Sequence, residues 1–216
     1  MFKRRDRRPV WRVVTSAVYP DGGWRRAFWY VQARLQRLPD TPEKIGRGVW
    51  AGVFTTFTPF FGLHFVVAAL VAKAMRGNIL ASLMATFFGN PLTYLPIAVA
   101  SLGTGRWMLG RGHDPHEIAT LGHRFSDAGR DLWHNTRALF TPERADWQNL
   151  QLFFDDIFLP WMIGGLVPGM ITATLVYYAI VPILAAQQKR RRNKLRAKLG
   201  RLTAPPPGDG PPPETD

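Results

Sequence analysis

The chain contains no cysteine among its 216 residues. Disulfide bonds, thiolate metal ligands and cysteine nucleophiles are therefore excluded. The sequence also lacks a Gly-x-Ser-x-Gly element, a P-loop and a His-Glu-x-x-His pair, the short motifs that position a nucleophile, a phosphate group or a catalytic zinc ion. We therefore expect neither an enzyme nor a bound cofactor.

Acidic residues are few compared with basic ones. The chain has 15 Asp and Glu against 28 Lys and Arg, a net charge of +13, and the excess is concentrated at the two ends. Such an excess suits either nucleic acid or the anionic headgroups of a membrane. Because the basic ends flank long apolar runs, we expect anionic phospholipids as partners. Nucleic-acid binding is the less favoured alternative, and it would show a steep salt dependence.

Charge is absent altogether from three long runs, 49–72, 77–105 and 157–188. All 43 charged residues lie between or outside these runs. A transmembrane helix needs about 20 apolar residues, and each run exceeds that length. The sequence therefore predicts an all-α integral membrane protein.

Each run also contains residues that interrupt helices. The first run has Thr-Pro-Phe-Phe-Gly at 58–62, and the second has Gly-Asn-Pro-Leu-Thr at 89–93. The third has Pro160, a glycine-rich stretch from Gly164 to Gly169, and Pro182. Proline lacks a backbone N–H donor and disfavours the helical conformation of the residue before it. We therefore expect all three runs to be broken.

The charges suggest how the broken runs sit in the membrane. Three straight crossings would place the two basic ends on opposite sides, against the positive-inside rule. Halves of the first run, such as 46–58 and 62–74, are roughly 20 Å long as helices, too short for a hydrocarbon core of about 30 Å. We therefore expect broken or re-entrant apolar helix hairpins, with both termini cytoplasmic. The alternative is two kinked full spans over 49–105 and a broken third run. In the hairpin arrangement, the positions that return to the cytoplasmic side are 75, 110 and 195.

The charged segments divide the chain into three parts. Residues 1–40 form a basic arm followed by an amphipathic interfacial helix over 23–38, which we expect to lie in the headgroup region. The alternative is a helix that packs on a core. Residues 41–188 form the membrane domain, with a polar helical insert at 106–156. Residues 189–216 combine a basic juxtamembrane segment with a proline-rich tail that we expect to be disordered.

Local signals mark several helix starts. Thr41-Pro42-Glu43 and Thr141-Pro142-Glu143 combine a threonine cap with proline in the first turn, and Asp114-Pro115-His116-Glu117 resembles a capping box. We expect Asp155 and Asp156 to cap the membrane interface rather than bind a cation. The spacing of the histidines is a weak metal-ligand pattern, so we expect no metal at His113, His116, His123 and His134.

Residues 42–110 carry a pattern that resembles a known family. It comprises Gly48-Val49-Trp50-Ala51-Gly52, Pro59-Phe60-Phe61-Gly62-Leu63-His64, Arg76-Gly77-Asn78 and Gly89-Asn90-Pro91-Leu92-Thr93, with Pro96. This pattern is similar to the bacterial membrane family catalogued as domain of unknown function 2062. The resemblance implies a protein of the bacterial cytoplasmic membrane, and no established activity comes with it. One departure is His64, where the resemblance leads us to expect glutamine.

Polar side chains inside the apolar runs are the candidate ligand-binding groups. Polar residues at membrane depth face protein or water, and paired interrupted helices are typical of transporter binding sites. Broken helices also expose helix amino termini, which suit an anionic group. Alternatively, the polar groups only satisfy the backbone that the breaks set free. The candidate residues are Thr58, Pro59, Gly62, His64, Arg76, Asn78, Asn90, Pro91 and Thr93.

Two functions are compatible with this pattern. The first is binding, and translocation, of an anionic lipid or a small anionic solute where the broken helices meet. The second is a membrane adaptor that recruits a cytoplasmic partner enzyme. Hairpin tips must be buried in protein, so we expect them to pair within one chain or across a homo-oligomer. We also predict that Asn90→Leu abolishes binding and that Pro91→Ala lets the helix run straight.

Overall fold

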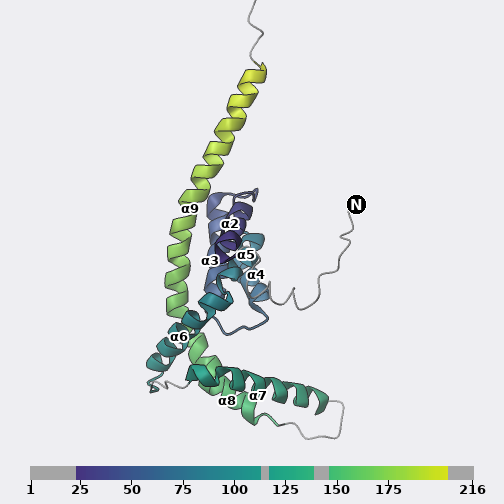
Figure 1. Cartoon of the computed structure of the whole chain (residues 1–216), viewed down its shortest axis with the longest axis vertical. Coiled ribbons are helices and arrows are strands. Elements are labelled where there is room, and N and C mark those ends of the chain that lie inside the picture. Colours follow the sequence, from purple (N-terminus) through teal and green to yellow (C-terminus); the bar gives the residue numbers. More distant parts are fainter. Residues whose placement is uncertain (1–22, 113–116, 139–145, 204–216) are drawn as a thin grey trace, which may run out of the picture.

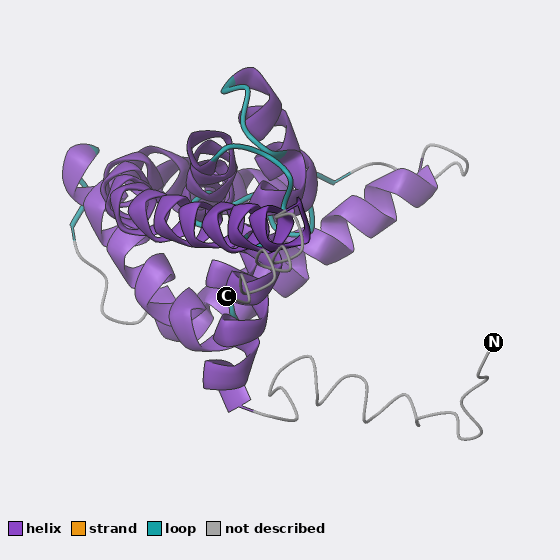
Figure 2. Ribbon diagram, turned by 90° about the horizontal axis from the view of Figure 1, so that it is seen from above, coloured by secondary structure: helices purple, strands orange, loops and turns teal. Residues whose placement is uncertain are grey.

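The structure is a computed structural model that describes residues 23–112, 117–138 and 146–203. These residues form helices and loops and no strand (Figure 2), so the predicted all-α fold is confirmed. The elements in chain order are α2 (Gly23–Leu35), α3 (Pro42–Thr55), α4 (His64–Ala74), α5 (Ile79–Ala85), the 3₁₀ turn η1 (Thr86–Phe88), α6 (Pro91–Met108), α7 (Glu117–Ala138), α8 (Gln148–Phe153), the π-helical turn η2 (Phe154–Phe158) and α9 (Leu159–Thr203).

The long helix α9 is the axis of the molecule (Figure 1). α3 and α6 make the most extensive contacts with it, and α2, α4 and α5 complete the cluster. α7 and α8 project sideways from the amino-terminal end of α9, whereas its carboxyl-terminal end extends beyond the other helices (Figure 1). The basic and the mixed-charge segments therefore lie at opposite ends of α9.

α3 is the central helix of the cluster, and its start was predicted. Thr41 accepts a hydrogen bond from the backbone N–H of Lys44 at 3.3 Å, and proline follows at the first helical position. Two glycines face α5: a Cβ on Gly48 would lie 2.2 Å from the carbonyl oxygen of Asn78, and Gly52 is equally close to α5. Small residues let helix backbones approach closely, so these positions do not tolerate larger side chains.

The first apolar run is broken where the sequence predicted. α3 ends at Thr55, the chain turns through Gly62, which has φ of +77°, and α4 begins at His64. α4 packs beside α3 and ends in a left-handed turn at Arg76, with φ of +52°. The N–H of Gly77 then donates to the carbonyl of Ala72 at 2.7 Å, which closes a Schellman cap.

The second run is also broken, and here the two parts differ strongly in direction. Ile79–Phe88 and Pro91–Met108 meet at an angle of 85° across a break of a few residues. The stretch Gln148–Gly200 is long and apolar enough to cross a membrane, and this bent pair is a second candidate if it counts as one span. α4 is apolar but shorter.

The third run is not broken, and this prediction was wrong. α9 continues through Gly164 to Gly169 and through Pro182 up to Thr203. Its glycines serve close packing, because a Cβ on Gly165 would lie 2.0 Å from the carbonyl oxygen of Phe57. Prolines in such a helix are tolerated where neighbouring groups satisfy the freed carbonyls. The expected fold-back of the third run therefore does not occur.

α2 packs on the helical core. Leu35 is buried, and Val31 and Leu38 are partly buried against the same cluster. Trp29 and Tyr30 are exposed. Of the two interpretations of the amphipathic helix at 23–38, packing on a core is the one observed. The two remaining residues of its apolar stripe have side chains outside the described set: Trp24 and Phe28.

α7 and α8 form a hairpin fastened by side chains of α7. The Asp131 carboxylate accepts hydrogen bonds from the N–H groups of Asn149 and Leu150, at 2.9 and 3.1 Å. Asn135 exchanges two hydrogen bonds with the backbone of Asp146, at 2.6 and 2.8 Å. The polar insert is therefore a packed helical unit.

Several charged and titratable side chains of this unit are described by the structure. Asp156 pairs with Arg124 at 3.0 Å. His123 and His134 are exposed on α7, and in the part of the chain that the structure describes, no three His, Asp or Glu side chains gather as metal ligands would. The start signals at 113–116 and 141–143 lie outside the described residues, as does the proline-rich tail.

Candidate functional site

The first break is lined by threonines that bond to the end of α3. The Thr55 hydroxyl donates to the carbonyl of Ala51, and the Thr56 hydroxyl donates to the carbonyl of Val53, both at 2.7 Å. The Thr58 hydroxyl donates to the carbonyl of Thr55 at 2.6 Å. The last carbonyls of a helix lack partners further along the helix. These buried hydroxyls therefore add hydrogen bonds to the backbone at the end of α3.

The tip of the first hairpin is enclosed by α6 and α9. The carbonyl of Phe57 accepts a hydrogen bond from Trp161 Nε1 at 3.1 Å and another from the Ser101 hydroxyl at 3.5 Å. The Phe61 ring packs edge-on against Trp161 and Tyr94, with ring centroids 5.2 and 5.5 Å apart. The turn between α3 and α4 is therefore enclosed by other parts of the described chain.

His64 occupies the first position of α4. Its Nε2 atom lies 3.1 Å from the carbonyl oxygen of Thr58; a carbonyl only accepts, so Nε2 is the donor. The residue before α4 is Leu63, and α4 has no side-chain cap. Its first N–H groups therefore keep the partial positive charge of a helix amino terminus.

The second break is closed by a capping box. The amide oxygen of Asn90 accepts the N–H groups of Leu92 and Thr93 at 2.9 and 3.2 Å, and the Thr93 hydroxyl accepts the N–H of Asn90 at 3.0 Å. Thr93 also donates to the carbonyl of Phe88, and Pro91 stands at the first position of α6. The amino terminus of α6 is thus satisfied by its own chain, unlike that of α4.

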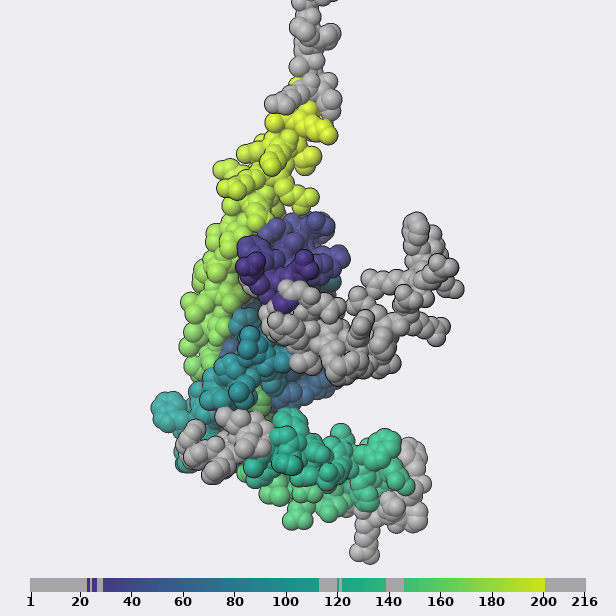
Figure 3. Space-filling model, in the orientation of Figure 1, coloured from purple at the N-terminus to yellow at the C-terminus, as the bar shows by residue number. Residues whose placement is uncertain are grey.

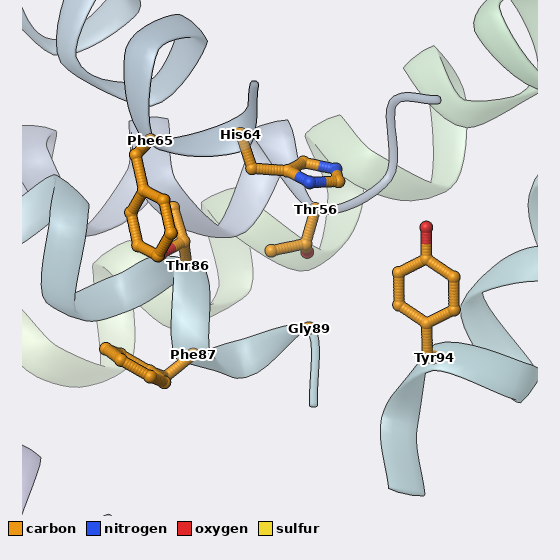
Figure 4. A pocket seen from close by; sticks show the side chains of 7 residues that line it. All are labelled: Thr56, His64, Phe65, Thr86, Phe87, Gly89 and Tyr94. Atoms are coloured by element: carbon orange, nitrogen blue, oxygen red, sulfur yellow. The ribbon is translucent and has the colours of Figure 1, made fainter. Parts of the chain in front are cut away.

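The two breaks meet around a cavity of about 200 Å³. Figure 4 shows side chains from both breaks directed toward it, with the ring of Tyr94 standing across from His64. The remaining walls are aromatic rings and threonine side chains. The residues that line this cavity are Thr56, His64, Phe65, Thr86, Phe87, Gly89 and Tyr94.

The cavity is largely apolar, with a few polar groups. The hydroxyls of Thr56 and Thr86 already donate to backbone carbonyls, which leaves their oxygens as acceptors. The Tyr94 hydroxyl is buried and has no hydrogen-bond partner among the described residues. A buried polar group of this kind is uncommon and calls for an explanation such as an unseen ligand or water.

The nine predicted site residues do not form a single cluster. His64 lines the cavity. Thr58, Pro59 and Gly62 belong to the first break, and Asn90, Pro91 and Thr93 belong to the second, so these six lie in the two loops that meet there. Arg76 and Asn78 lie at the other ends of α4 and α5 and are not brought to the cavity.

Sequence reasoning missed several residues that line the cavity. Tyr94 and Phe87 look like ordinary apolar positions of a membrane helix, and Phe65 follows the predicted His64 directly. The available signal was the hydroxyl of Tyr94, a polar group within an uncharged run. Its role depends on which loops meet in space, which local sequence patterns do not encode.

Asn78 belongs to a separate cluster around Asp40. Asn78 caps α5 by accepting the N–H of Ala81 at 2.7 Å, and its amide also donates to the Asp40 carboxylate. Lys44 pairs with the same carboxylate at 2.8 Å. The hydrogen bonds from Lys44 and from Asn78 hold the pKa of Asp40 below its usual value. This cluster fixes the ends of α3 and α5 to each other.

Comparison with known proteins identifies a family and nothing more specific. No curated protein and no solved structure matches the chain. Residues 25–193 match the family described as "Uncharacterized protein conserved in bacteria (DUF2062)". Because the match extends over more than half of the sequence and includes both broken runs, the chain belongs to this bacterial family.

Proposed function

We propose that the chain is an integral protein of the bacterial cytoplasmic membrane that binds an anionic lipid or a small anionic solute between its two broken runs. The observation that carries the proposal is the cavity in which the two breaks meet. Paired interrupted helices whose breaks meet are the arrangement found at many transporter binding sites.

The apolar surface supports insertion in a membrane. Only 17% of the apolar window in Gln148–Gly200 is buried, so this stretch is unlike the core helix of a soluble protein. Soluble monomers rarely expose extended apolar patches. Large apolar side chains are exposed along three helices: Phe65, Val66 and Leu70 of α4, Leu92, Leu95 and Val99 of α6, and Leu166, Val167, Met170, Ile171 and Leu175 of α9.

Helix lengths support one re-entrant hairpin and two crossings. α3 and α4, with 14 and 11 residues, reach roughly 21 and 17 Å, less than a hydrocarbon core of about 30 Å. The apolar part of α9, residues 159–188, reaches roughly 45 Å. In our proposal the first run is re-entrant, the second is one bent span, and the third is a full span.

The distribution of charge agrees with this topology. Residues 106–156 hold six arginines and eight acidic residues, whereas the rest of the chain holds 22 basic and seven acidic residues. Positive charge favours the cytoplasmic side. Two crossings leave both termini cytoplasmic and put α7 and α8 on the opposite side. This differs from the sequence-based prediction for residue 110, because α9 does not fold back.

The cavity suits a small anionic group better than a large ligand. Sites for drug-sized molecules enclose about 300–1,000 Å³, whereas this cavity encloses about 200 Å³. The uncapped amino terminus of α4 favours negative charge. The Tyr94 hydroxyl supplies a donor that is not used within the described chain. A phosphate or carboxylate, free or as part of a lipid headgroup, matches these features.

Tyr94→Phe tests the proposal because it removes one hydroxyl and keeps the ring. Without ligand, we expect the variant to melt at a higher temperature, since a buried unsatisfied polar group costs about 1–3 kcal/mol. With ligand, we expect the dissociation constant to rise about tenfold or more, the effect of losing one hydrogen bond to a charged group. The measurement is thermal stabilisation of the detergent-solubilised protein by dioctanoyl phosphatidylglycerol, phosphatidylcholine and inorganic phosphate.

Tyr178→Phe is the matched control, because Tyr178 is an exposed tyrosine on α9. We expect this variant to respond to every additive as the wild type does. His64→Gln probes the other wall: it keeps a donor to the Thr58 carbonyl and removes the titratable imidazole. If wild type, Tyr94→Phe and Tyr178→Phe respond alike to every anionic additive, the cavity is not the binding site.

A membrane adaptor is the second candidate function. It is favoured by the exposed basic end of α9, residues 189–200, which extends beyond the other helices into the side that we propose is cytoplasmic (Figure 1). The two functions predict different rates of lipid transfer between the leaflets of a membrane. A transporter accelerates transfer of labelled phosphatidylglycerol between the leaflets of reconstituted vesicles, and Tyr94→Phe slows that transfer. An adaptor leaves the transfer rate equal to that of protein-free vesicles.

A further inference from the structure

A second concave site lies between α2 and the carboxyl-terminal part of α9. It is an open groove of about 410 Å³. In Figure 3, α2 (purple) lies directly against α9 (green to yellow) at this level. The groove is lined by three arginines, two glutamines and one alanine, namely Ala33, Gln36, Arg37, Gln187, Arg190 and Arg191.

Hydrogen bonds between distant segments hold the groove in shape. Arg191 donates to the carbonyl of Gln36 at 3.3 Å, and Gln188 donates to the carbonyl of Asp40 at 2.9 Å. The end of α2 is thereby fixed to one turn of α9. The groove is therefore a feature of the fold and not a chance gathering of surface side chains.

The charge of the groove is positive and is not neutralised nearby. None of its lining residues is acidic. Arg37 and Arg190 have no ion-pair partner in the described segments. The closest acid in the sequence, Asp40, is already bound by Lys44 and Asn78. Two free guanidinium groups facing one groove suit a phosphate, which guanidinium binds in bidentate fashion.

The surroundings of the groove favour a lipid over a free ion. One helical turn before the groove on α9, Pro182 and Ile183 are exposed to the solvent or lipid. On α2, Tyr30 is exposed and shares a helix face with Ala33. Exposed tyrosines and arginines at the end of an apolar span are typical of the headgroup level.

We propose that this groove binds the phosphate of an anionic phospholipid in the cytoplasmic leaflet, with the acyl chains along the exposed apolar surface of α9. The site rests on the proposed topology. It is separate from the cavity between the breaks and requires no ligand there. Its role is to anchor α2 and the basic end of α9 at the membrane surface.

The test uses the full chain carrying Tyr94→Phe, so that binding at the cavity is weakened equally in every variant compared. Arg37→Gln with Arg190→Gln removes the two free guanidinium groups of the groove. Arg192→Gln with Arg196→Gln is the control, because it removes the same charge from exposed positions of α9 that do not line the groove. Binding of dioctanoyl phosphatidylglycerol, dioctanoyl phosphatidylcholine and inorganic phosphate is measured by thermal stabilisation.

We expect the groove variant to bind phosphatidylglycerol about tenfold more weakly, the effect of losing one charge-assisted hydrogen bond. The control variant should change by less than about threefold, and phosphatidylcholine should have little effect on either. Folded yield should be unaffected because all four arginines are exposed. Equal weakening in both variants would show that only diffuse charge attracts the lipid. Equal stabilisation by inorganic phosphate and by phosphatidylglycerol would overturn the assignment to lipid.

Discussion

Asn90 accepts two N–H groups at the start of α6, and Thr93 returns a hydrogen bond to the N–H of Asn90. This reciprocal arrangement sets the direction in which α6 leaves the break. Pro91 contributes only its fixed φ. Its missing backbone N–H costs nothing, because the first residue of a helix has no acceptor for one within the helix. The side chain of Asn90, one of the candidate ligand-binding residues, is thus engaged by the backbone.

Substitutions of Asn90 and Pro91 should differ in how much stability they remove. Asn90→Ala should lower the free energy of unfolding by about 0.5–2 kcal/mol, the usual effect of losing an N-cap. Pro91→Ala should cost less than about 1 kcal/mol and should leave the bend in place. The measurement is unfolding in detergent followed by circular dichroism. A larger loss for Pro91→Ala than for Asn90→Ala would mean that the proline, as we first predicted, sets the bend.

Asp40 allows a prediction about pH. Its pKa is lowered by hydrogen bonds from Lys44 and from Asn78, so the charged form stabilises the fold. This contribution is present above the pKa of the unfolded chain, about 4, and is lost as the pH falls through the lower pKa of the folded protein. Asp40→Asn should therefore melt below the wild type at pH 7, and the difference should shrink at acidic pH.

Asp127→Asn is the control for Asp40. Asp127 pairs with Arg130 at 3.4 Å on the exposed side of α7. Such surface pairs contribute little to stability, so the melting temperature should hardly change at any pH. A constant difference between Asp40→Asn and wild type from pH 7 to pH 3 would argue against the stabilising role of the carboxylate.

At the scale of whole elements, two glycines of α9 differ in the space around them, and substitution by alanine should affect stability in opposite directions. A Cβ on Gly165 would meet the Phe57 carbonyl oxygen at 2.0 Å, whereas a Cβ on Gly200 would meet nothing within 4 Å. Gly165→Ala should therefore push α9 away from the tip of the first hairpin, at a cost of about 1–3 kcal/mol or more. Gly200→Ala should stabilise the helix by up to about 1 kcal/mol.

The pair Gly165→Ala and Gly200→Ala is measured as a difference in melting temperature of the purified protein. The two variants share one helix and one chemical change, so helix propensity alone predicts the same sign for both. Stabilisation by both substitutions would contradict the close contact between α9 and the hairpin tip.

The same glycines explain why one element was predicted wrongly. The first two breaks could be predicted because local chemistry makes them: Gly62 takes a left-handed conformation, and Asn90 and Thr93 cap the following helix. Gly164 to Gly169 contains similar residues but lies where another backbone approaches. Glycine and proline in an apolar run therefore mark either a break or a close contact, and the sequence alone does not separate the two.

At the scale of the whole molecule, α9 decides the topology. Because it is continuous, residue 195 lies far from its amino-terminal end, where Arg111 donates to the carbonyl of Asp155. Residue 75 lies toward the other end, because the carbonyl of Arg76 accepts from Arg47 and the chain just before α3 is bonded to Gln188. The chain has no cysteine, so single cysteines at these three positions can be labelled without background. We expect labelling from the cytoplasmic side at 75 and 195 and from the opposite side at 110.

Labelling of all three positions from one side would contradict the full span by α9 and support a re-entrant third run. Labelling of 75 together with 110 from the opposite side would instead favour a full crossing by the first run. Our proposal has two crossings, and an even number of crossings places both termini on the same side. The sequence-based prediction also placed both termini on one side, but through three folded-back runs and no full crossing.

The cavity is the part of the site that the sequence could not provide. Local patterns identified the loops around Pro59 and Asn90, but only the packing of both against α9 brings Tyr94 opposite His64. The carbonyl of Phe57 accepts hydrogen bonds from Ser101 and Trp161, and both donors come from later runs of the sequence. Contacts of such sequence separation depend on the global arrangement of helices, which periodicity and capping signals do not describe.

The hydrogen bond from Trp161 to the Phe57 carbonyl also has a consequence for biosynthesis. Ribosomes add about 5–20 residues per second, so Trp161 is made roughly 5–20 s after Phe57. During that interval the Phe57 carbonyl at the hairpin tip lacks its donor, Trp161. In the proposed membrane topology, a tip without this hydrogen bond is costly to bury in lipid. In the proposed membrane topology, the first run should therefore become fully buried only after the last helix has been made. Ribosome-bound chains that end before α9 should accordingly expose the first run to protease.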